Sequence, residues 1–280
     1  MTTRILCLHG LGSNSAILES QLQPFRSQLP PSWEFEFLDG ETTSRPFLDV
    51  GKTFPGPYLC YYDAPTPEKV QAAVDLVMDA VEEDGPFDAV LGFSYGASLA
   101  VTVIAAAAEK SPNKLPPFKS AILFNSITPY RLGSGPLHIT HDLSIPGKGA
   151  VVSAYRDDYT AAQNEKYDIW NDPEADSTVQ EMKMRQTEPR GTITDKGTTA
   201  LLLGYYAPIH GIRVRVPTLH VHGENDAFYT QSKRVVDLCD PAPGRKVISH
   251  SGGHHFPKDT ATMAKVVNAI EWVVERGAHA

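Results

Sequence analysis

Cysteine is scarce in this sequence of 280 residues. Cys7, Cys60 and Cys239 are scattered, and no two of them have the C-x-x-C spacing. An odd and sparse set of thiols argues against a disulfide framework and is typical of a reducing compartment. We therefore expect free thiols in a cytoplasmic protein, with Cys7 buried in the first strand.

Long apolar runs are also missing. The apolar stretch within MTTRILCLHG is only about five residues long, whereas the core of a signal peptide needs roughly 7–15. No other window approaches the roughly 18–20 apolar residues of a membrane span. The sequence thus predicts neither a secretory leader nor a membrane segment.

Basic charge is in deficit. The 25 Lys and Arg side chains face 33 Asp and Glu side chains, which gives a formal net charge of −8. This balance argues against broad electrostatic binding to nucleic acid or to anionic lipid. Repeats and low-complexity segments are absent too, while a hydrophobic content of 41% suffices for a sizeable buried core.

Short apolar runs alternate with helical patterns over most of the chain. Most runs lack polar alternation, so they predict strands buried on both faces of a mostly parallel sheet. They are RILCLH (4–9), WEFEFLDG (33–40), FDAVLGF (87–93), KSAILFN (119–125), VPTLHVH (216–222) and RKVISH (245–250). The clearest helix begins after Thr66, a suitable N-cap, with Pro67 at its first position. The sequence therefore predicts an α/β fold with helices on both faces of the sheet.

Two stretches break this rhythm. Residues 41–65 are rich in proline and have no period, which indicates a long loop. Residues 128–212 are turn-rich and polar, and they lie between two strand–helix units. We expect one domain over 1–280, in which 128–212 is an inserted lid over the carboxyl edge of the sheet, where ligands bind. The apolar part of this insertion, ALLLGYYAPI, either lines an acyl pocket or packs against the sheet.

The segment GFSYG, residues 92–96, matches the pattern G-x-S-x-G between a predicted strand and a predicted helix. A serine at the tip of such a turn is exposed to substrate, and only small residues fit two positions away on either side. The strand-to-helix context favours Ser94 as a nucleophile over a structural turn serine.

A serine nucleophile needs a base and a group that orients the base. In chain order, Asp226 follows a predicted strand by a short loop, and Glu224 competes with it. Three histidines then follow in HSGGHHFP: His250, His254 and His255. We favour His254 as the base because it directly follows two glycines, with His255 as the alternative.

An acyl oxyanion requires two aligned donors. We expect these to be the backbone N–H groups of Tyr95 and of Leu11, which lies in the loop HGLGSN after the first strand. That loop lacks the G-x-G-x-x-G spacing of nucleotide sites. His220 and His222 share a strand face, but the pattern around them does not match a binuclear metal site. We expect neither a cofactor nor a metal.

These motifs together resemble the FSH family of fungal serine hydrolases, within the α/β-hydrolase superfamily. The resemblance rests on LCLHGLGSNSAILESQL, FPGPYLCYYD, GPFDAVLGFSYGASLA, PTLHVHGENDAFY and HSGGHHFP. It implies an α/β-hydrolase fold, with Ser94 as nucleophile, Asp226 as acid and His254 as base. Leu11 and Tyr95 would form the oxyanion hole. The family contains carboxylesterases and thioesterases that release polyketide chains.

The resulting hypothesis is hydrolysis of an acyl thioester or carboxylic ester through an acyl-serine. Two alternatives stay open: transfer of the acyl group to an acceptor other than water, and a ligand-binding protein on a hydrolase scaffold. An acyl carrier protein is a plausible partner for a thioesterase. Basic residues in and after the insertion would form its docking patch or a solvated surface: Arg131, Arg156, Arg185, Arg190, Arg213 and Arg215.

Overall fold

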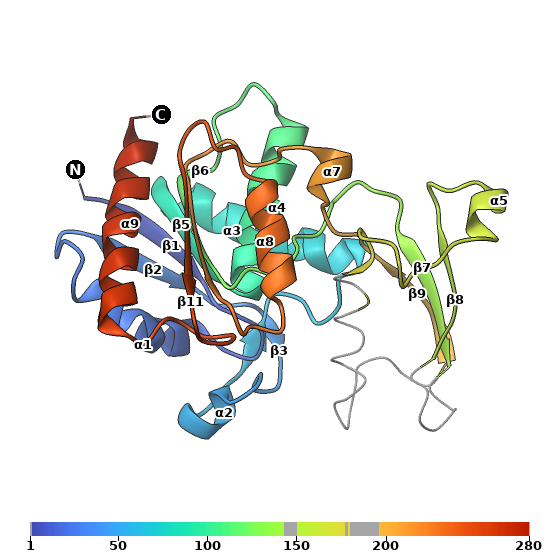
Figure 1. The fold of residues 1–280 in the computed structure, drawn as a ribbon, viewed down its shortest axis with the longest axis horizontal. Helices are drawn as coiled ribbons and strands as arrows, with labels where there is room; N and C mark the ends of the chain where they lie inside the picture. The colour runs from blue at the N-terminus through green and yellow to red at the C-terminus, as the bar shows by residue number, and fades with distance from the viewer. Residues whose placement is uncertain (1, 143–149, 177–178, 180–195, 280) are drawn as a thin grey trace.

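A sheet of six parallel strands forms the centre of the computed structural model (Figure 1), which describes residues 2–142, 150–176, 179 and 196–279. The strand order is β11-β10-β6-β5-β1-β2, and every neighbouring pair is parallel. The bounds are β1 Arg4–Leu8, β2 Glu34–Leu38, β5 Phe87–Phe93, β6 Phe118–Phe124, β10 Thr218–Gly223 and β11 Arg245–His250. These are the six runs that the sequence predicts, and the predicted α/β architecture is confirmed.

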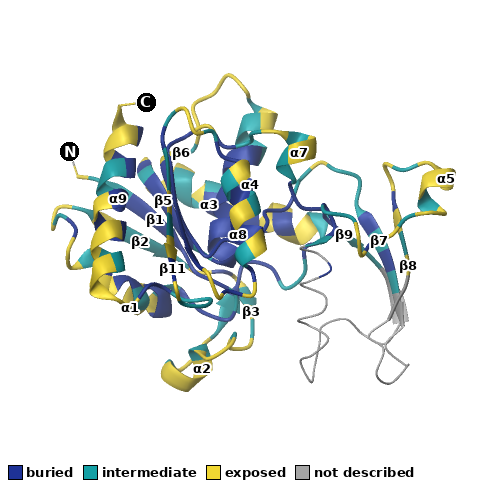
Figure 2. Cartoon of the chain, in the orientation of Figure 1, coloured by how far each residue is buried: buried dark blue, intermediate teal, exposed yellow. Residues whose placement is uncertain are grey.

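Helices cover both faces of this sheet. Helices α1 (Ser15–Arg26) and α9 (Thr260–Ala278) pack on one face, and α3 (Pro67–Asp84), α4 (Tyr95–Lys110) and α8 (Tyr229–Asp237) pack on the other. Successive residues of β1 point to opposite faces, so that Ile5 and Cys7 join one core cluster and Leu6 and Leu8 join the other. The inner strands are therefore buried on both sides (Figure 2).

Side-chain caps fix where the long helices begin. The Asn14 carboxamide oxygen accepts a hydrogen bond from the N–H of Ile17 at the start of α1, at 2.8 Å. The Thr66 hydroxyl caps α3 in the same way, with Pro67 at the first position. Both caps satisfy N–H groups that lack an intrahelical acceptor. None of the helices described here is long and apolar enough to cross a membrane.

The stretch 41–65 carries more structure than the predicted loop. Strands β3 (Thr42–Thr43) and β4 (Leu59–Cys60) pair antiparallel, and the short helix α2 (Val50–Thr53) lies between them. We call residues 45–54 the strap. It contacts the loop after β1, because the N–H of Phe47 donates to the carbonyl of Gly12 at 3.4 Å. The chain that follows the strap is held to the same loop, because the N–H of Gly12 donates to the carbonyl of Leu59 at 3.0 Å and the N–H of Leu59 donates to the carbonyl of Ser13 at 2.7 Å.

The insertion contains a second sheet, which the sequence reading missed. Strands β7 (Leu137–Asp142), β8 (Ala150–Arg156) and β9 (Lys196–Leu201) form an antiparallel sheet in the order β8-β7-β9, with short helices α5 (Ala161–Asn164) and α7 (Ala207–His210) nearby. It lies to one side of the main sheet (Figure 1) and has its own apolar cluster. The segment ALLLGYYAPI packs into three separate buried clusters, with Leu202 in the main core.

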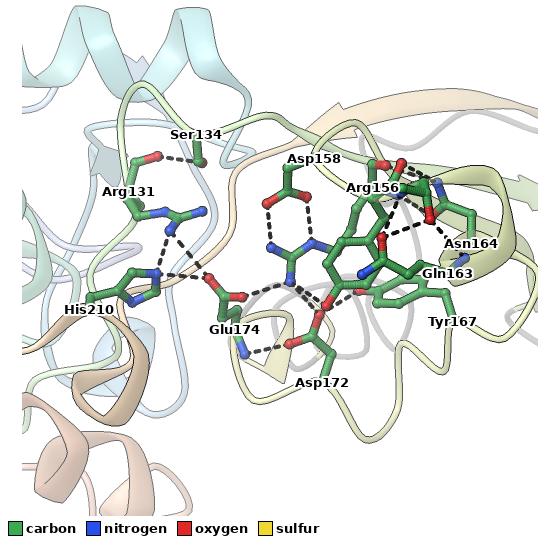
Figure 3. A network of polar contacts seen from close by, with 12 residues as sticks. Arg131, Ser134, Arg156, Asp158, Gln163, Asn164, Tyr167, Asp172, Glu174 and His210 are labelled. Carbon is green, nitrogen blue, oxygen red and sulfur yellow. Dashed lines mark hydrogen bonds and ion pairs between the residues drawn. The ribbon is translucent and has the colours of Figure 1, made fainter.

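An ionic network centred on the buried Arg156 connects residues of the insertion (Figure 3). The Arg156 guanidinium lies 2.7 Å from Glu174, 2.9 Å from Asp172 and 2.7 Å from Asp158. Glu174 also lies 3.5 Å from Arg131. Burial of a guanidinium is tolerable only with such partners, because an unpaired charge is costly to desolvate.

This network corrects the expected docking patch. Arg156 is only 3% exposed, and Arg131 is committed to Glu174, so neither offers a free charge to a partner. Arg213 pairs with Glu109 at 3.4 Å. Of the remaining arginines in that prediction, Arg215 is exposed, and two lie outside the described residues: Arg185 and Arg190.

Candidate active site

The site lies where the order of the strands reverses. From β1 the chain moves outward to the edge strand β2, then crosses back to β5 on the other side of β1. The loops that follow β1 and β5 therefore diverge, and a crevice opens at the carboxyl end of the sheet. Leu11 stands in the first of these loops and Ser94 directly follows β5.

Ser94 occupies a strained turn between β5 and α4. Its φ of 54° and ψ of −112° lie in a region that residues other than glycine rarely adopt. The flanking glycines are required by close packing: a Cβ on Gly92 would lie 2.4 Å from the nitrogen of Ala97, and one on Gly96 would lie 2.1 Å from the carbonyl of Leu8. The G-x-S-x-G pattern is thus explained by steric fit.

His254 bridges Ser94 and Asp226. Its Nε2 lies 2.8 Å from Ser94 Oγ, and its Nδ1 lies 2.7 Å from Asp226 Oδ2. Three aromatic rings surround the imidazole, with centroid distances of 5.1 to 6.1 Å: Phe228, Phe93 and Phe47. The three side chains that the sequence singles out are therefore brought together in one hydrogen-bonded chain.

Asp226 is held as a carboxylate. Its Oδ1 accepts from the N–H of Phe228 at 2.8 Å, and its Oδ2 accepts from the side chain of Asn125 at 2.7 Å. Burial by itself raises the pKa of this carboxyl, but the hydrogen bonds from His254, Phe228 and Asn125 outweigh burial and lower the pKa. The competing Glu224 is exposed and contacts none of these groups.

The other two histidines of this loop shape it instead of reaching Ser94. His255 Nδ1 donates to the carbonyl of Phe256 at 2.7 Å, and its Nε2 accepts from the N–H of Gly253 at 3.3 Å. His250 Nδ1 accepts from the N–H of Gly252 at 3.1 Å. Both rings therefore fix the backbone that presents His254.

The sequence reading missed His9, which anchors the loop carrying Leu11. His9 is fully buried, and burial lowers its pKa, so the imidazole is neutral. Its Nε2 accepts from the N–H of Gly40 at 3.0 Å and its Nδ1 donates to Gly10. Its backbone N–H donates to the Tyr61 hydroxyl at 2.9 Å. Only the aromatic pair in CYYD hinted at this contact.

Of the two expected oxyanion donors, Tyr95 directly follows Ser94 in the chain and Leu11 lies in the loop after β1. Tyr95 is the first residue of α4, so its N–H stands at the positive end of the helix. Leu11 and Ser94 line the same cavity. Their role as oxyanion donors stays a prediction.

His220 and His222 form hydrogen bonds with side chains of the main sheet. His220 Nε2 lies 3.1 Å from Thr218 Oγ1, and burial lowers the His220 pKa to about 3. His222 Nε2 lies 3.2 Å from the Ser249 hydroxyl. Within the described part of the chain, no group of three or more His, Cys, Asp or Glu side chains is arranged to hold a metal ion.

A cavity of about 710 Å³ opens at Ser94 and His254. It lies between the strap, α1 and the residues that follow His254. Its apolar lining includes five phenylalanines: Phe25, Phe47, Phe54, Phe93 and Phe256. No described residue of 128–212 lines it, and the strap forms one of its walls. The lid role of the insertion stays a prediction.

This parallel sheet, with a serine at a strained strand-to-helix turn and a His–Asp pair beside it, defines a serine hydrolase of the α/β-hydrolase fold. The chain belongs to the FSH1 serine hydrolase family, whose model matches residues 1–266. The family resemblance that the sequence suggests is confirmed.

Individual relatives agree with this assignment, and solved structures share the fold. The chain is 31% identical to hydrolase FUB4 of Gibberella moniliformis over 273 residues, which covers 97% of each chain. It is 28% identical to esterase alnB of Emericella nidulans over 285 residues, which covers 97% of this chain and 96% of the relative. Two solved structures share the fold at a TM-score of 0.50 and 14% identity. They are a point variant of SOBER1 from Arabidopsis thaliana, with 99% of each chain covered, and esterase PE8, with 97% of this chain and 93% of that chain covered.

Proposed function

We propose that Ser94, His254 and Asp226 form a catalytic triad that cleaves an acyl thioester or carboxylic ester. The bridging position of His254, 2.8 Å from Ser94 Oγ and 2.7 Å from Asp226, carries this proposal. Ser94 Oγ attacks the substrate carbonyl while His254 Nε2 takes the hydroxyl proton. The bond to the leaving thiol or alcohol then breaks, and His254 returns the proton to it. Asp226 fixes the tautomer that carries hydrogen on Nδ1.

Water completes the reaction. It attacks the acyl-Ser94 carbonyl with His254 again as base, and a carboxylic acid leaves as Ser94 is restored. The N–H groups of Leu11 and Tyr95 are proposed to stabilise the oxyanion in both halves. Transfer of the acyl group to an alcohol or carbon acceptor would use the same intermediate, and the mass of the product distinguishes the two outcomes.

The cavity supports an apolar acyl group as the substrate. Its phenylalanine lining is suited to a bulky or ring-containing chain, while polar residues stand elsewhere in the lining: Gln21, Asp49, Thr53 and Lys258. The relatives described above are an esterase and a hydrolase from fungi. We therefore propose release of a polyketide or similar acyl chain in fungal secondary metabolism. An acyl carrier protein as the donor stays a prediction.

Acyl-enzyme formation tests the triad directly. Incubation with a panel of acyl thioesters and esters should give an acyl adduct on Ser94 that intact-mass spectrometry detects. Ser94→Ala should lose the adduct and lower kcat by at least about 10,000-fold. Ser98→Ala is the matched control and should leave kcat unchanged, because Ser98 is a buried serine on α4, the helix that directly follows Ser94, and its hydroxyl donates to the carbonyl of Thr128 at 3.2 Å. Turnover by Ser94→Ala would refute the triad.

A further inference from the structure

Asn125 stands at the junction of the two loops that carry His254 and Asp226. It directly follows β6 and is fully buried. Its φ of 46° lies in the left-handed region, which asparagine tolerates better than most residues. Its backbone N–H donates to the carbonyl of Val221 at 2.7 Å, which ties it to β10. The peptide is thereby fixed, and the side chain points toward Asp226.

The carboxamide of Asn125 joins both loops through one nitrogen. Nδ2 donates to Asp226 Oδ2 at 2.7 Å and to the carbonyl of Gly253 at 3.2 Å. A flipped amide would place its oxygen against two acceptors, so these contacts determine its orientation. Gly253 directly precedes His254. The amide therefore constrains Asp226 through its carboxylate oxygen and His254 through the backbone of the preceding residue, Gly253.

We infer that Asn125 is a positioning residue that aligns His254 with Asp226 and shares the negative charge of the Asp226 carboxylate. This inference rests on the proposed function. Oδ2 of Asp226 accepts both from Asn125 and from His254 Nδ1. A second donor on that oxygen reduces the charge that faces the imidazole. The carboxylate still orients His254 through its hydrogen bond with Nδ1.

Other charged groups near this pair do not account for the same effect. His222 and His250 lie close enough to interact with Asp226, but burial lowers the pKa of each, so both are neutral at neutral pH. The positive charge of Lys233 lowers the pKa of His222 further. His254 itself is enclosed by aromatic rings. A change in pH dependence after substitution of Asn125 therefore reports the Asp226–His254 pair.

Two substitutions test this role. Asn125→Gly removes the side chain and still permits the left-handed backbone, while Asn125→Asp keeps the shape but replaces the donor with a negative charge. We expect kcat to fall about 10-fold for Gly and about 100-fold for Asp, with KM within about 2-fold. The acid limb of the kcat/KM profile should move to higher pH in both variants, and further in Asn125→Asp, because more negative charge faces the imidazole.

A double substitution and a matched control separate positioning from general damage. In an Asp226→Ala background, adding Asn125→Gly should lower kcat by a smaller factor than it does alone, because only the contact with Gly253 remains to be lost. Asn164→Gly is the control, because that amide also donates to two carbonyls, those of Arg156 and Tyr159, away from Ser94. It should leave the acid limb in place.

The inference is overturned if Asn125→Gly keeps wild-type kcat, or lowers kcat with an unmoved acid limb and an unchanged effect in the Asp226→Ala background. Melting temperatures check that each variant folds. If Asn125→Gly does not fold, the kinetics of Asn125→Asp test the inference instead. Failure of the proposed function looks different, because Ser94→Ala would then retain turnover.

Discussion

Among single residues, His9 has a ring whose face and both nitrogens are engaged in contacts within the fold. Its ring stacks on Tyr61 with centroids 4.7 Å apart, and both of its ring nitrogens have backbone partners. Burial raises the pKa of Tyr61 well above its usual value, so the hydroxyl stays protonated and donates to the carbonyl of Leu38 at 2.9 Å. A pair of neutral rings therefore anchors the backbone two residues before Leu11.

Tyr61→Phe should lower both stability and activity. The substitution leaves the N–H of His9 without its acceptor, which costs about 1–3 kcal/mol of unfolding free energy. Because the loop with Leu11 then loosens, we expect kcat to fall about 10-fold. Urea unfolding and steady-state kinetics measure the two effects. Tyr205→Phe, which removes a hydroxyl bound to Glu109 at 3.0 Å, should lower stability alone. Wild-type kcat in Tyr61→Phe would contradict this account.

Among the elements, the strap depends most on one residue outside itself. Gly12 has a φ of 61°, and a Cβ there would lie 2.2 Å from the carbonyl of Arg45 and 2.4 Å from the nitrogen of Phe47. The missing side chain lets the strap lie directly on the loop after β1. Phe47 and Leu48 then complete the cavity wall next to His254.

Gly12→Ala should impair large substrates more than small ones. The added methyl group collides with backbone atoms of the strap, so the cavity wall must move. We expect kcat/KM for a long or ring-containing acyl ester to fall about 10-fold or more, and for an acetyl ester by less than about 3-fold. Gly133→Ala is the control: its φ of 77° imposes the same backbone strain, but nothing lies within 4 Å of the added Cβ. Equal losses on both esters would refute the steric role.

Sequence reasoning succeeded for the elements with a clear apolar pattern, namely the six parallel strands and the helices between them. It missed the sheet of the insertion because its strands are partly polar and lie in a turn-rich stretch without helical patterns between them. It also missed Asn125 and His9, whose roles depend on contacts through space. The Asn125–Asp226 contact joins residues 101 positions apart, and His9 meets Tyr61 across 52. No local pattern records such distances.

For the whole molecule, the site exists only when the sheet is complete. His9, Ser94, Asn125, Asp226 and His254 follow five different strands of the six. The same sheet and its loops bury several histidines in neutral form, because burial lowers the pKa of each of them: His9, His220, His222 and His250. The unfolded chain binds protons at these histidines at a higher pH than the folded chain does.

Unfolding free energy should therefore decrease as the pH falls below about 6.5, where histidines of the unfolded chain become protonated. His220, with a pKa of about 3 when folded, should account for about 2 kcal/mol between pH 7 and pH 5. Urea unfolding at both pH values measures the change. His220→Gln should show a smaller decrease than wild type, while the exposed His279→Gln should not. Stability that is constant or higher at pH 5 would contradict the prediction.

The hydrogen bond from the N–H of Phe47 to the carbonyl of Gly12 has a further consequence, together with the bonds between Leu59 and the Gly12–Ser13 turn. They tie the strap, which forms one wall of the cavity, to the loop that carries Leu11. We expect a ligand too large for the cavity to displace the strap, and this displacement would be transmitted to the loop of Leu11. The size of the cavity and the position of the proposed oxyanion donor are therefore coupled.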